Sequence, residues 1–346
     1  MDGFFFAYLC FMLNSLNYSF IIPVFNRPEE VKELLKSFLK LDFKAAYEIV
    51  IIEDGSIKTC KSIISDFKEN LNISYYFKEN SGPGDSRNFG MQMAKGNYFI
   101  ILDSDCILPS QYLKTVDAFL NNEFYHCFGG ADSANIDFTT LQKAINYTMT
   151  SFYTTGGIRG SKKSIQKFEP RSFNMGISKE VFLKTKGFSK IHPGEDPDLS
   201  QRILKENYHT VFIPNAFVYH KRKVSWKKFY KQVYKFGLVR PILNNWHPKS
   251  AKITFCFPTI FIFFVITSLF FGIVFNILFL VPLATYSSIV LVDSSIKNKS
   301  IFIGILSVIA LFIQFIGYGS AFLKSTIYIR ILKRDPKKQF PQLFFK

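Results

Sequence analysis

An acidic pair, Asp103-Ser104-Asp105, is the part of this sequence whose residue types most directly suggest chemistry. It follows the apolar run 98–102, where a buried strand is expected to end. Two carboxylates at positions i and i+2 beyond a strand end can face one crevice, and hard divalent cations take such oxygen ligands. Asp-x-Asp after a strand is more often a solvated turn or a helix cap. The pair therefore predicts a metal-held phosphate ligand only if other features agree.

The segments around the pair alternate between apolar strands and helical stretches. Strands are expected over 19–24, 48–53, 73–78 and 98–102, and helices over 29–41, 57–69 and 85–94. This alternation predicts an α/β fold with a doubly wound sheet. Ligands of such sheets bind beyond the carboxyl ends of the strands. Here those ends are followed by polar loops that suit a nucleotide.

The chain becomes strongly apolar after residue 251. Uncharged runs cover 253–275, 276–292 and 301–323. At about 1.5 Å per residue, the first and third can cross about 30 Å of hydrocarbon, and the second is at the short end of the range. Basic residues between the second and third runs and after the third favour the cytoplasmic side. With a cytoplasmic head, we expect an even number of crossings and a re-entrant or interfacial middle run.

The net charge limits the classes of binding partner that we expect, and the cysteine content indicates the cellular compartment. The net charge of +17 allows nucleic acid, anionic lipid or a phosphorylated substrate as a partner. Because apolar runs occur in the same chain and no nucleic-acid motif is recognised, we expect membrane and phosphorylated substrate, and no nucleic acid. The five cysteines lack paired or metal-ligand spacing, which fits a reducing compartment.

Several motifs in order resemble the family 2 glycosyltransferases of GT-A fold. They lie at 19–26, 51–56, 82–90, 103–105 and 194–199. The resemblance implies a Rossmann-like, doubly wound mixed sheet over 18–240, the nucleotide-diphospho-sugar transferase domain. An apolar N-terminal extension (1–17) would precede it, and a membrane region (241–346) with two or three apolar helices and a basic tail would follow.

The resemblance also implies roles for individual residues. Asp54 would bind the base or ribose, and Arg87 would lie near the phosphates, where its cationic fork suits oxyanions. Asp105, supported by Asp103, would hold Mg²⁺ or Mn²⁺ against the diphosphate, and His220 is a further candidate ligand. A turn, an internal salt bridge and a structural histidine are the alternatives for Asp54, Arg87 and His220. The remaining nucleotide-sugar-binding candidates are Pro23, Phe25, Asn26, Arg27, Glu53 and Ser104.

By the same resemblance, Asp196 would be the general base. It would deprotonate an acceptor hydroxyl that attacks the anomeric carbon from the face opposite the diphosphate, which inverts the configuration. Helix capping is the structural alternative for Asp196. Glu195 and Asn174 would support this loop or touch the acceptor.

The resemblance implies an inverting, metal-dependent enzyme. Transfer of a single sugar is favoured because the Gln-x-x-Arg-Trp motif of processive synthases does not follow the acidic pair at 195–196. A UDP-sugar is the favoured donor, and the acceptor would be a lipid-linked glycan or glycolipid of cell-surface polysaccharide or glycolipid synthesis. The protein would be multi-pass in the cell inner membrane, with a cytoplasmic catalytic domain. The alternatives are a polyprenyl-phosphate glycosyltransferase, whose anionic acceptor needs no base, and a non-catalytic nucleotide-binding membrane scaffold.

Overall fold

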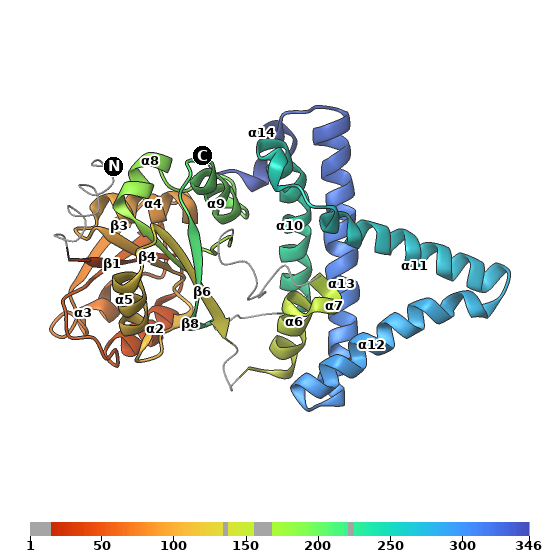
Figure 1. Ribbon diagram of the computed structural model, residues 1–346, viewed down its shortest axis with the longest axis horizontal. Helices are drawn as coiled ribbons and strands as arrows, with labels where there is room; N and C mark the ends of the chain where they lie inside the picture. Colours follow the sequence, from red (N-terminus) through yellow and green to blue (C-terminus); the bar gives the residue numbers. More distant parts are fainter. Residues whose placement is uncertain (1–14, 134–137, 156–167, 221–224, 346) are drawn as a thin grey trace. The chain divides into compact units, whose positions relative to one another are not determined.

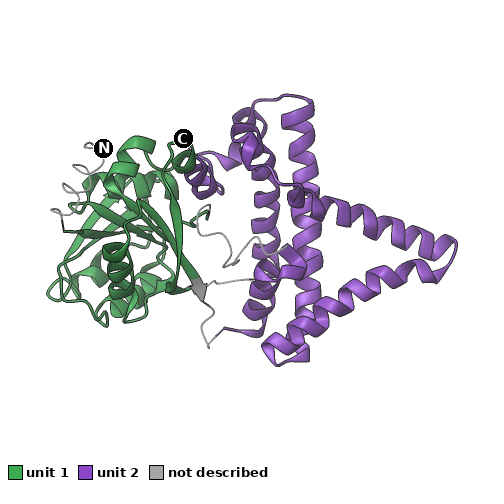
Figure 2. Ribbon diagram, in the orientation of Figure 1, with its two compact units in different colours: residues 1–132, 165–189, 202–219 green, residues 133–164, 190–201, 220–346 purple. Residues whose placement is uncertain are grey.

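The computed structural model describes residues 15–133, 138–155, 168–220 and 225–345. These residues divide into two compact units, coloured separately in Figure 2. The first, called the sheet unit, lies within residues 1–132, 165–189 and 202–219. The second, called the helical unit, lies within residues 133–164, 190–201 and 220–346. Each unit is therefore assembled from segments that are far apart in the sequence.

The sheet unit is built on one mixed β-sheet (Figure 1). The spatial order of its eight described strands is β3-β2-β1-β4-β7-β6-β8-β5. Their bounds are β1 (Tyr18–Val24), β2 (Glu48–Asp54), β3 (Ile73–Lys78), β4 (Tyr98–Leu102), β5 (Cys106–Ile107), β6 (Cys127–Ser133), β7 (Asn174–Ser178) and β8 (Thr210–His220). Strands β1 to β4 are parallel, and β7 pairs antiparallel with β4. The carboxyl ends of β1 to β4 consequently share one edge of the sheet.

Helices cover both faces of this sheet. On one face lie α2 (Pro28–Phe38), α3 (Lys61–Ser65) and α5 (Tyr112–Asn122), and on the other lie α4 (Pro83–Met93) and α8 (Lys179–Thr185). The α4 backbone approaches so closely that a Cβ on Gly90 would be 2.5 Å from Cδ1 of Ile52. Because both faces are covered, a central strand such as β4 can be apolar throughout.

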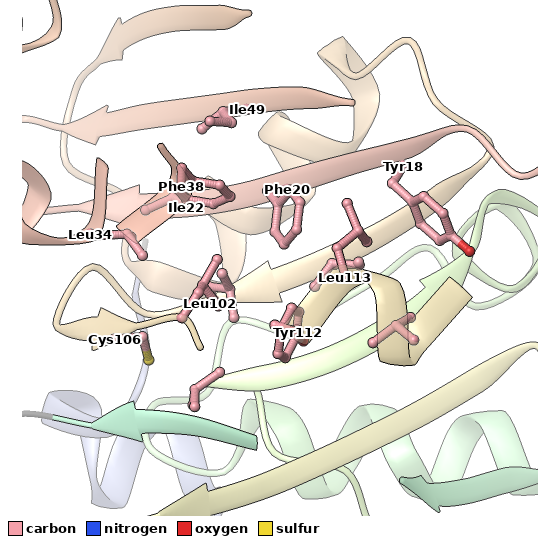
Figure 3. Close-up of a cluster of buried hydrophobic side chains, with 14 of the residues drawn as sticks. Tyr18, Phe20, Ile22, Leu34, Phe38, Ile49, Leu102, Cys106, Tyr112 and Leu113 are labelled. Atoms are coloured by element: carbon pink, nitrogen blue, oxygen red, sulfur yellow. The ribbon is translucent and has the colours of Figure 1, made fainter. Parts of the chain in front are cut away.

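Figure 3 shows the main core, which lies between the sheet, α2 and α5. Phe20 of β1 packs edge to face on Phe38 of α2, with ring centroids 4.8 Å apart. Tyr112 of α5 is also fully buried. A fully buried large apolar side chain stabilises the fold by about 1.5–3 kcal/mol. This packing holds the strands that end at the candidate site.

The helical unit contains α6 and α7 after β6, the start of α9, and the helices that follow β8. Their bounds are α6 (Thr140–Thr150), α7 (Phe152–Thr155), α9 (Glu195–Lys205, in this unit up to residue 201), α10 (Trp226–Trp246), α11 (Phe257–Val274), α12 (Val281–Asn298), α13 (Ile301–Thr326) and α14 (Pro336–Gln339). A π-helical turn, Ile327–Ile331, extends α13. Figure 1 shows α10 beside α13, with α11 and α12 meeting at a turn away from α13.

Three helical segments of the described chain are long and apolar enough to cross a membrane. They are Ile253–Val274, Ile277–Asn298 and Ile301–Ile331. The middle segment has 22 residues because the helix continues past the uncharged run. In this extension Lys297 pairs with Asp293 one turn away, at 2.9 Å.

The predicted α/β sheet is confirmed, and its first four strands agree with the expected ranges to within one residue. The helix predicted over 57–69 is wrong in extent, since only Lys61–Ser65 forms α3. The Asn26 side chain accepts hydrogen bonds from the N–H groups of Ile57 and Lys58, at 2.9 and 3.0 Å. These contacts hold the start of the segment in a loop.

Candidate active site

The acidic pair lies directly after β4, at the shared carboxyl edge of the parallel strands. The Cys106 N–H donates to the carbonyl oxygen of Asp103 at 3.1 Å, which closes a turn around the pair. The side chains of Asp103 and Asp105 are 31% and 10% exposed, and Ser104 between them is buried. Both carboxylates are therefore accessible in part, as a ligand site requires.

Each of these carboxylates is bound by an arginine from another loop or helix. Nη1 of Arg27, at the start of α2, lies 2.6 Å from Oδ2 of Asp105. Nη2 of Arg87, in α4, lies 2.8 Å from Oδ1 of Asp103. Arg87 is buried, and its guanidinium also lies 5.3 Å from the ring centroid of Phe188. The fold thus brings four of the predicted site residues together in two ion pairs.

Asn26 connects the loop after β1 to the loop after β2. Its φ of 54° is in the left-handed region, which Asn tolerates better than most residues. Its side chain accepts from the backbone at residues 57 and 58, and its own N–H donates to Oγ of Ser56 at 2.7 Å. Asn26 therefore positions the neighbouring Arg27. A direct contact with the nucleotide stays a prediction.

Asp54, the last residue of β2, shapes the loop that leads into α4. Its Oδ1 accepts from the Ser81 N–H at 3.0 Å and from Nζ of Lys78 at 2.9 Å, and its Oδ2 accepts from the Gly82 N–H at 3.0 Å. The side chain is only 5% exposed. Since this loop begins the helix that carries Arg87, Asp54 helps to position that arginine. Its predicted contact with base or ribose is untested.

Glu53 has no exposed surface. Its Oε2 accepts from the N–H and the thiol of Cys60, each at 2.9 Å. Burial, together with the Glu53 carboxylate, raises the pKa of the Cys60 thiol, which keeps the thiol protonated as a donor. Oε1 of Glu53 is buried with no hydrogen-bond partner among the described residues. These contacts attach the start of α3 to β2, and the predicted nucleotide contact of Glu53 is untested.

Asn174 supports the sheet beside the acidic pair. It is opposite Leu102 in the register of β4 and β7, and it is fully buried. Its Oδ1 accepts from the hydroxyl of Tyr112 at 2.6 Å, and its Nδ2 donates to the carbonyls of Ala131 and Ala216 at 3.2 and 2.9 Å. Asn174 thereby links α5, β6 and β8 at one point.

Three other predicted residues have less defined surroundings. Pro23 lies within β1, opposite Ile52 in the register. Phe25 follows the strand and is 51% exposed. His220 ends β8, but its side chain lies outside the described residues, so its predicted metal contact stays a prediction.

The proposed base and its neighbours form the first turn of α9, in the helical unit. Glu195 is buried, and its Oε1 lies 3.0 Å from Nδ1 of His192. Asp196 is half-buried. Asp198 is buried, with Oδ1 2.8 Å from Nε2 of His247. Three acids in the first turn complement the positive end of the helix dipole, so capping and catalysis are both compatible with this position.

Sequence reasoning missed the residues that hold this turn. His247 follows α10, 49 residues after its partner Asp198. The C-terminal segment also contributes, because the His192 N–H donates to the Leu343 carbonyl at 2.8 Å and the Phe345 N–H donates to the Lys190 carbonyl at 3.0 Å. Neither feature has a local sequence signal, since each depends on residues that only the fold brings together.

The acidic pair suits a divalent cation that arrives with a phosphate ligand. No group of three or more His, Cys, Asp and Glu residues that could hold a metal ion occurs in the described part of the chain. Asp103 and Asp105 provide two carboxylates. Mg²⁺ at nucleotide sites is usually held by one or two carboxylates plus phosphate oxygens. The donor set therefore fits a cation shared with a diphosphate.

Comparison with known proteins agrees with this arrangement. The family model for glycosyl transferase family 2 matches residues 19–185, a range that contains both arginines and the acidic pair. In overall fold, the chain is similar to a mannosyltransferase, PcManGT from Pyrobaculum calidifontis, solved in complex with GDP-Man and Mn²⁺. The TM-score is 0.56 at 12% identity, over 93% of this chain and 89% of that chain.

Two curated relatives are bacterial enzymes. The chain is 31% identical over 109 residues to the poly(ribitol-phosphate) beta-N-acetylglucosaminyltransferase TarS of Staphylococcus aureus, which covers 31% of this chain and 19% of the relative. It is 28% identical over 205 residues to the GalNAc(5)-diNAcBac-PP-undecaprenol beta-1,3-glucosyltransferase of Campylobacter jejuni, which covers 58% of this chain and 62% of the relative. The matched regions thus span less than two thirds of each relative.

The mixed sheet, the acidic pair after β4 and the family match define a glycosyltransferase domain of GT-A fold. Residues 19–185 of this domain are the part of the chain that matches the glycosyl transferase family 2 model.

Proposed function

We propose that this protein is an inverting, metal-dependent glycosyltransferase that transfers a single sugar from a nucleotide-sugar donor to a lipid-linked glycan or glycolipid. The observation that carries the proposal is the double ion pair at the strand edge, Arg27–Asp105 and Arg87–Asp103. It places two carboxylates and two guanidinium groups around one turn. A diphosphate bound with a divalent cation offers opposite charges to both kinds of group.

The donor is proposed to bind at this edge through its diphosphate. Arg27 and Arg87 would donate hydrogen bonds to phosphate oxygens, for which their planar forks are suited. Asp103 and Asp105, with His220 as a further candidate, would hold Mg²⁺ or Mn²⁺. The bound cation would offset the negative charge on the departing nucleoside diphosphate. Phe25 and Asn26 would border the nucleotide. A UDP-sugar is the favoured donor.

Asp196 is proposed as the general base. Its carboxylate would accept the proton of the acceptor hydroxyl as that oxygen attacks the anomeric carbon, and general-base catalysis of this kind contributes about 10²–10⁴-fold. Glu195 and Asp198 are each held by a histidine, at 3.0 and 2.8 Å, which fixes the turn that presents Asp196. Glu195 is therefore proposed as a support for the base.

A membrane-bound acceptor fits the apolar helices of the chain. Three segments of the described residues are long and apolar enough to cross a bilayer. The names of the two relatives specify a poly(ribitol-phosphate) and an undecaprenol-linked acceptor. These features support our proposal that the protein lies in the cell inner membrane, with a catalytic domain over 18–240 on the cytoplasmic face and a membrane region over 241–346.

The test is release of nucleoside diphosphate from a panel of UDP-, GDP- and dTDP-sugars, with Mn²⁺ and a lipid extract. The intact chain is compared with Asp196→Asn, and Asp66→Asn, at an exposed site on the sheet unit, is the matched control. Acceptor-dependent release that is lost only in Asp196→Asn supports the proposal. Release that survives in Asp196→Asn indicates an anionic acceptor such as a polyprenyl phosphate.

A scaffold without catalysis would give a different result. In that case no donor is turned over with any lipid extract, while nucleoside diphosphate with Mn²⁺ still raises the melting temperature. This pair of results would contradict the proposed transfer but keep the nucleotide-binding site.

A further inference from the structure

The C-terminal segment is bonded to the segment that carries Asp196. The backbone hydrogen bonds from His192 to Leu343 and from Phe345 to Lys190 are accompanied by a β-bridge between Ile191 and Phe344. Buried Ile191 also packs in one apolar cluster with Leu343. These two segments must therefore lie on the same side of any membrane.

This contact limits how the chain between them can cross. Residues 202–335 include α10 and the three apolar helical segments. A chain that leaves one face and returns to it crosses the bilayer an even number of times. α10 is long enough but not apolar enough to cross. The three apolar segments therefore cannot all be complete crossings, so at least one of them remains on the face that carries Asp196 or turns back within the bilayer.

α13 is covered along much of its length by α10, which carries lysines. A Cβ on Gly237 of α10 would lie 2.3 Å from the Tyr318 carbonyl, and Oγ of Ser325 donates to the Leu238 carbonyl at 2.6 Å. The lysines of α10 are exposed, and they are Lys227, Lys228, Lys231 and Lys235. If α13 crossed the bilayer, these charges would stand beside its central turns, where lysine is costly.

The packing of α10 on α13 shows which part of α13 lies beside these lysines. Phe229 and Val233 pack in one cluster with Ala310, near the midpoint of the uncharged run 301–323. Exposed Lys231 lies between those two α10 residues in the sequence. If α13 crossed the bilayer, the Lys231 charge would thus lie near the bilayer centre. A lysine side chain can extend its charge to the headgroups only from near a helix end, so this charge would remain in hydrocarbon.

The hairpin of α11 and α12 has the opposite character. No charged residue occurs from 253 to 292. Only 11% of the apolar window in each of these helices is buried inside the protein, against 39% for α13. At the turn between them, Phe275, Ile277 and Leu278 are 67%, 73% and 66% exposed. An apolar surface of this extent fits hydrocarbon, while the nearest charges lie at the open ends of the hairpin.

Both ends of the hairpin are attached to α13. At the start of α11, the Thr259 hydroxyl donates to the Gly319 carbonyl at 2.9 Å. At the end of α12, Ser294 and Ser307 share a hydrogen bond of 2.7 Å. Figure 1 shows the three helices as the sides of a triangle, with α13 opposite the apolar turn. α13 therefore separates the apolar hairpin from the lysines of α10.

We propose that the α11–α12 hairpin is the element that inserts into the hydrocarbon of the bilayer, and that α13 lies along the membrane on the face that carries Asp196. This differs from the sequence expectation that the first and third runs cross. It places the loop at 299–300 and the basic tail on one face, together with the proposed base. The inference rests on the proposed membrane attachment and is independent of sugar transfer.

Cysteine labelling in sealed membrane vesicles of both orientations tests the topology. The parent chain carries Cys10→Ser and Cys256→Ser, and the other cysteines are buried. Single probes are Ser62→Cys on the sheet unit, Lys299→Cys between α12 and α13, Lys337→Cys on the basic tail, and Ile277→Cys at the hairpin turn. All four positions are exposed to the protein's surroundings. The reagent is a membrane-impermeant maleimide, and labelling after detergent shows that each thiol is reactive.

We expect the probes at 62, 299 and 337 to be labelled from the same face, and the probe at 277 to be protected from that face. Labelling of 299 and 337 from opposite faces would show that α13 crosses and would overturn the proposal. Labelling of position 277 from the face that labels position 62 would show that the hairpin is not inserted. Sugar transfer by the parent chain, measured separately, tests the proposed function, so either idea can fail while the other stands.

Discussion

The acidic pair with its arginines and the turn that carries Asp196 are two parts of the chain that are built in different ways. The acidic pair and its arginines lie within a few residues of strand ends or in the next helix, so local sequence places them once the sheet forms. The turn that carries Asp196 instead depends on His247 and on Leu343, which are far away along the chain. Local motifs thus encode the proposed donor site, whereas the position of the proposed base depends on long-range contacts.

The largest effect on activity is expected at the acidic pair. Asp105→Asn should lower transfer by about 10²–10³-fold, because it removes a carboxylate that is proposed to hold the cation against the diphosphate. It should also abolish the Mn²⁺-dependent rise in melting temperature with nucleoside diphosphate. Initial rates and thermal melts check this. Asp66→Asn is the control, and full activity in Asp105→Asn would remove this residue from the donor site.

The next largest effect is expected at Leu343, and it tests the turn that carries Asp196 separately from the acidic pair. Leu343 is fully buried against the segment before α9, and Leu343→Ala should destabilise that contact by about 2–5 kcal/mol. A base displaced by about 1 Å costs up to about 10²-fold in rate. We therefore expect lower kcat with unchanged nucleoside diphosphate binding, measured by kinetics and calorimetry. Loss of binding to the same degree would mean that the two parts are not separable.

A smaller effect is expected at His247. His247→Ala leaves the buried Asp198 carboxylate without this hydrogen bond, and we expect a fall in kcat of about 10-fold, equivalent to about 1.4 kcal/mol. His247→Gln, whose amide can donate in place of Nε2, should recover much of the rate. Equal losses in both variants would indicate that the imidazole does more than position the turn.

The smallest effect concerns the pH dependence of the sheet unit. Burial lowers the pKa of His126, although Glu180 acts in the opposite direction. The folded protein therefore binds this proton less readily than the unfolded chain, so stability is full above about pH 6.5 and falls as the pH decreases through the folded pKa. Thermal melts between about pH 7 and 5 should show a shallow decline that His126→Gln reduces. An unchanged slope would contradict this assignment.

Several tertiary features could not be read from the sequence because they depend on partners that are distant along the chain. Asn26 was predicted to bind nucleotide, but its contacts with residues 56–58 show that it also shapes the loops and shortens α3. Glu53 and Asp54 are adjacent, yet one is bonded to Cys60 under α3 and the other to the loop before α4. Successive strand residues face opposite ways, and only packing decides which face holds which partner.

The sequence alone determined the alternating elements, the strand ends and the acidic pair, because periodicity and polar breaks are local properties of a chain. It also determined that three segments are apolar enough for a membrane. Only the tertiary structure decided which arginine binds which carboxylate, which residues hold the turn of Asp196, and that α13 is covered by a lysine-bearing helix. Hydropathy measures one segment at a time, whereas the placement of a helix in a bilayer depends on what packs against it.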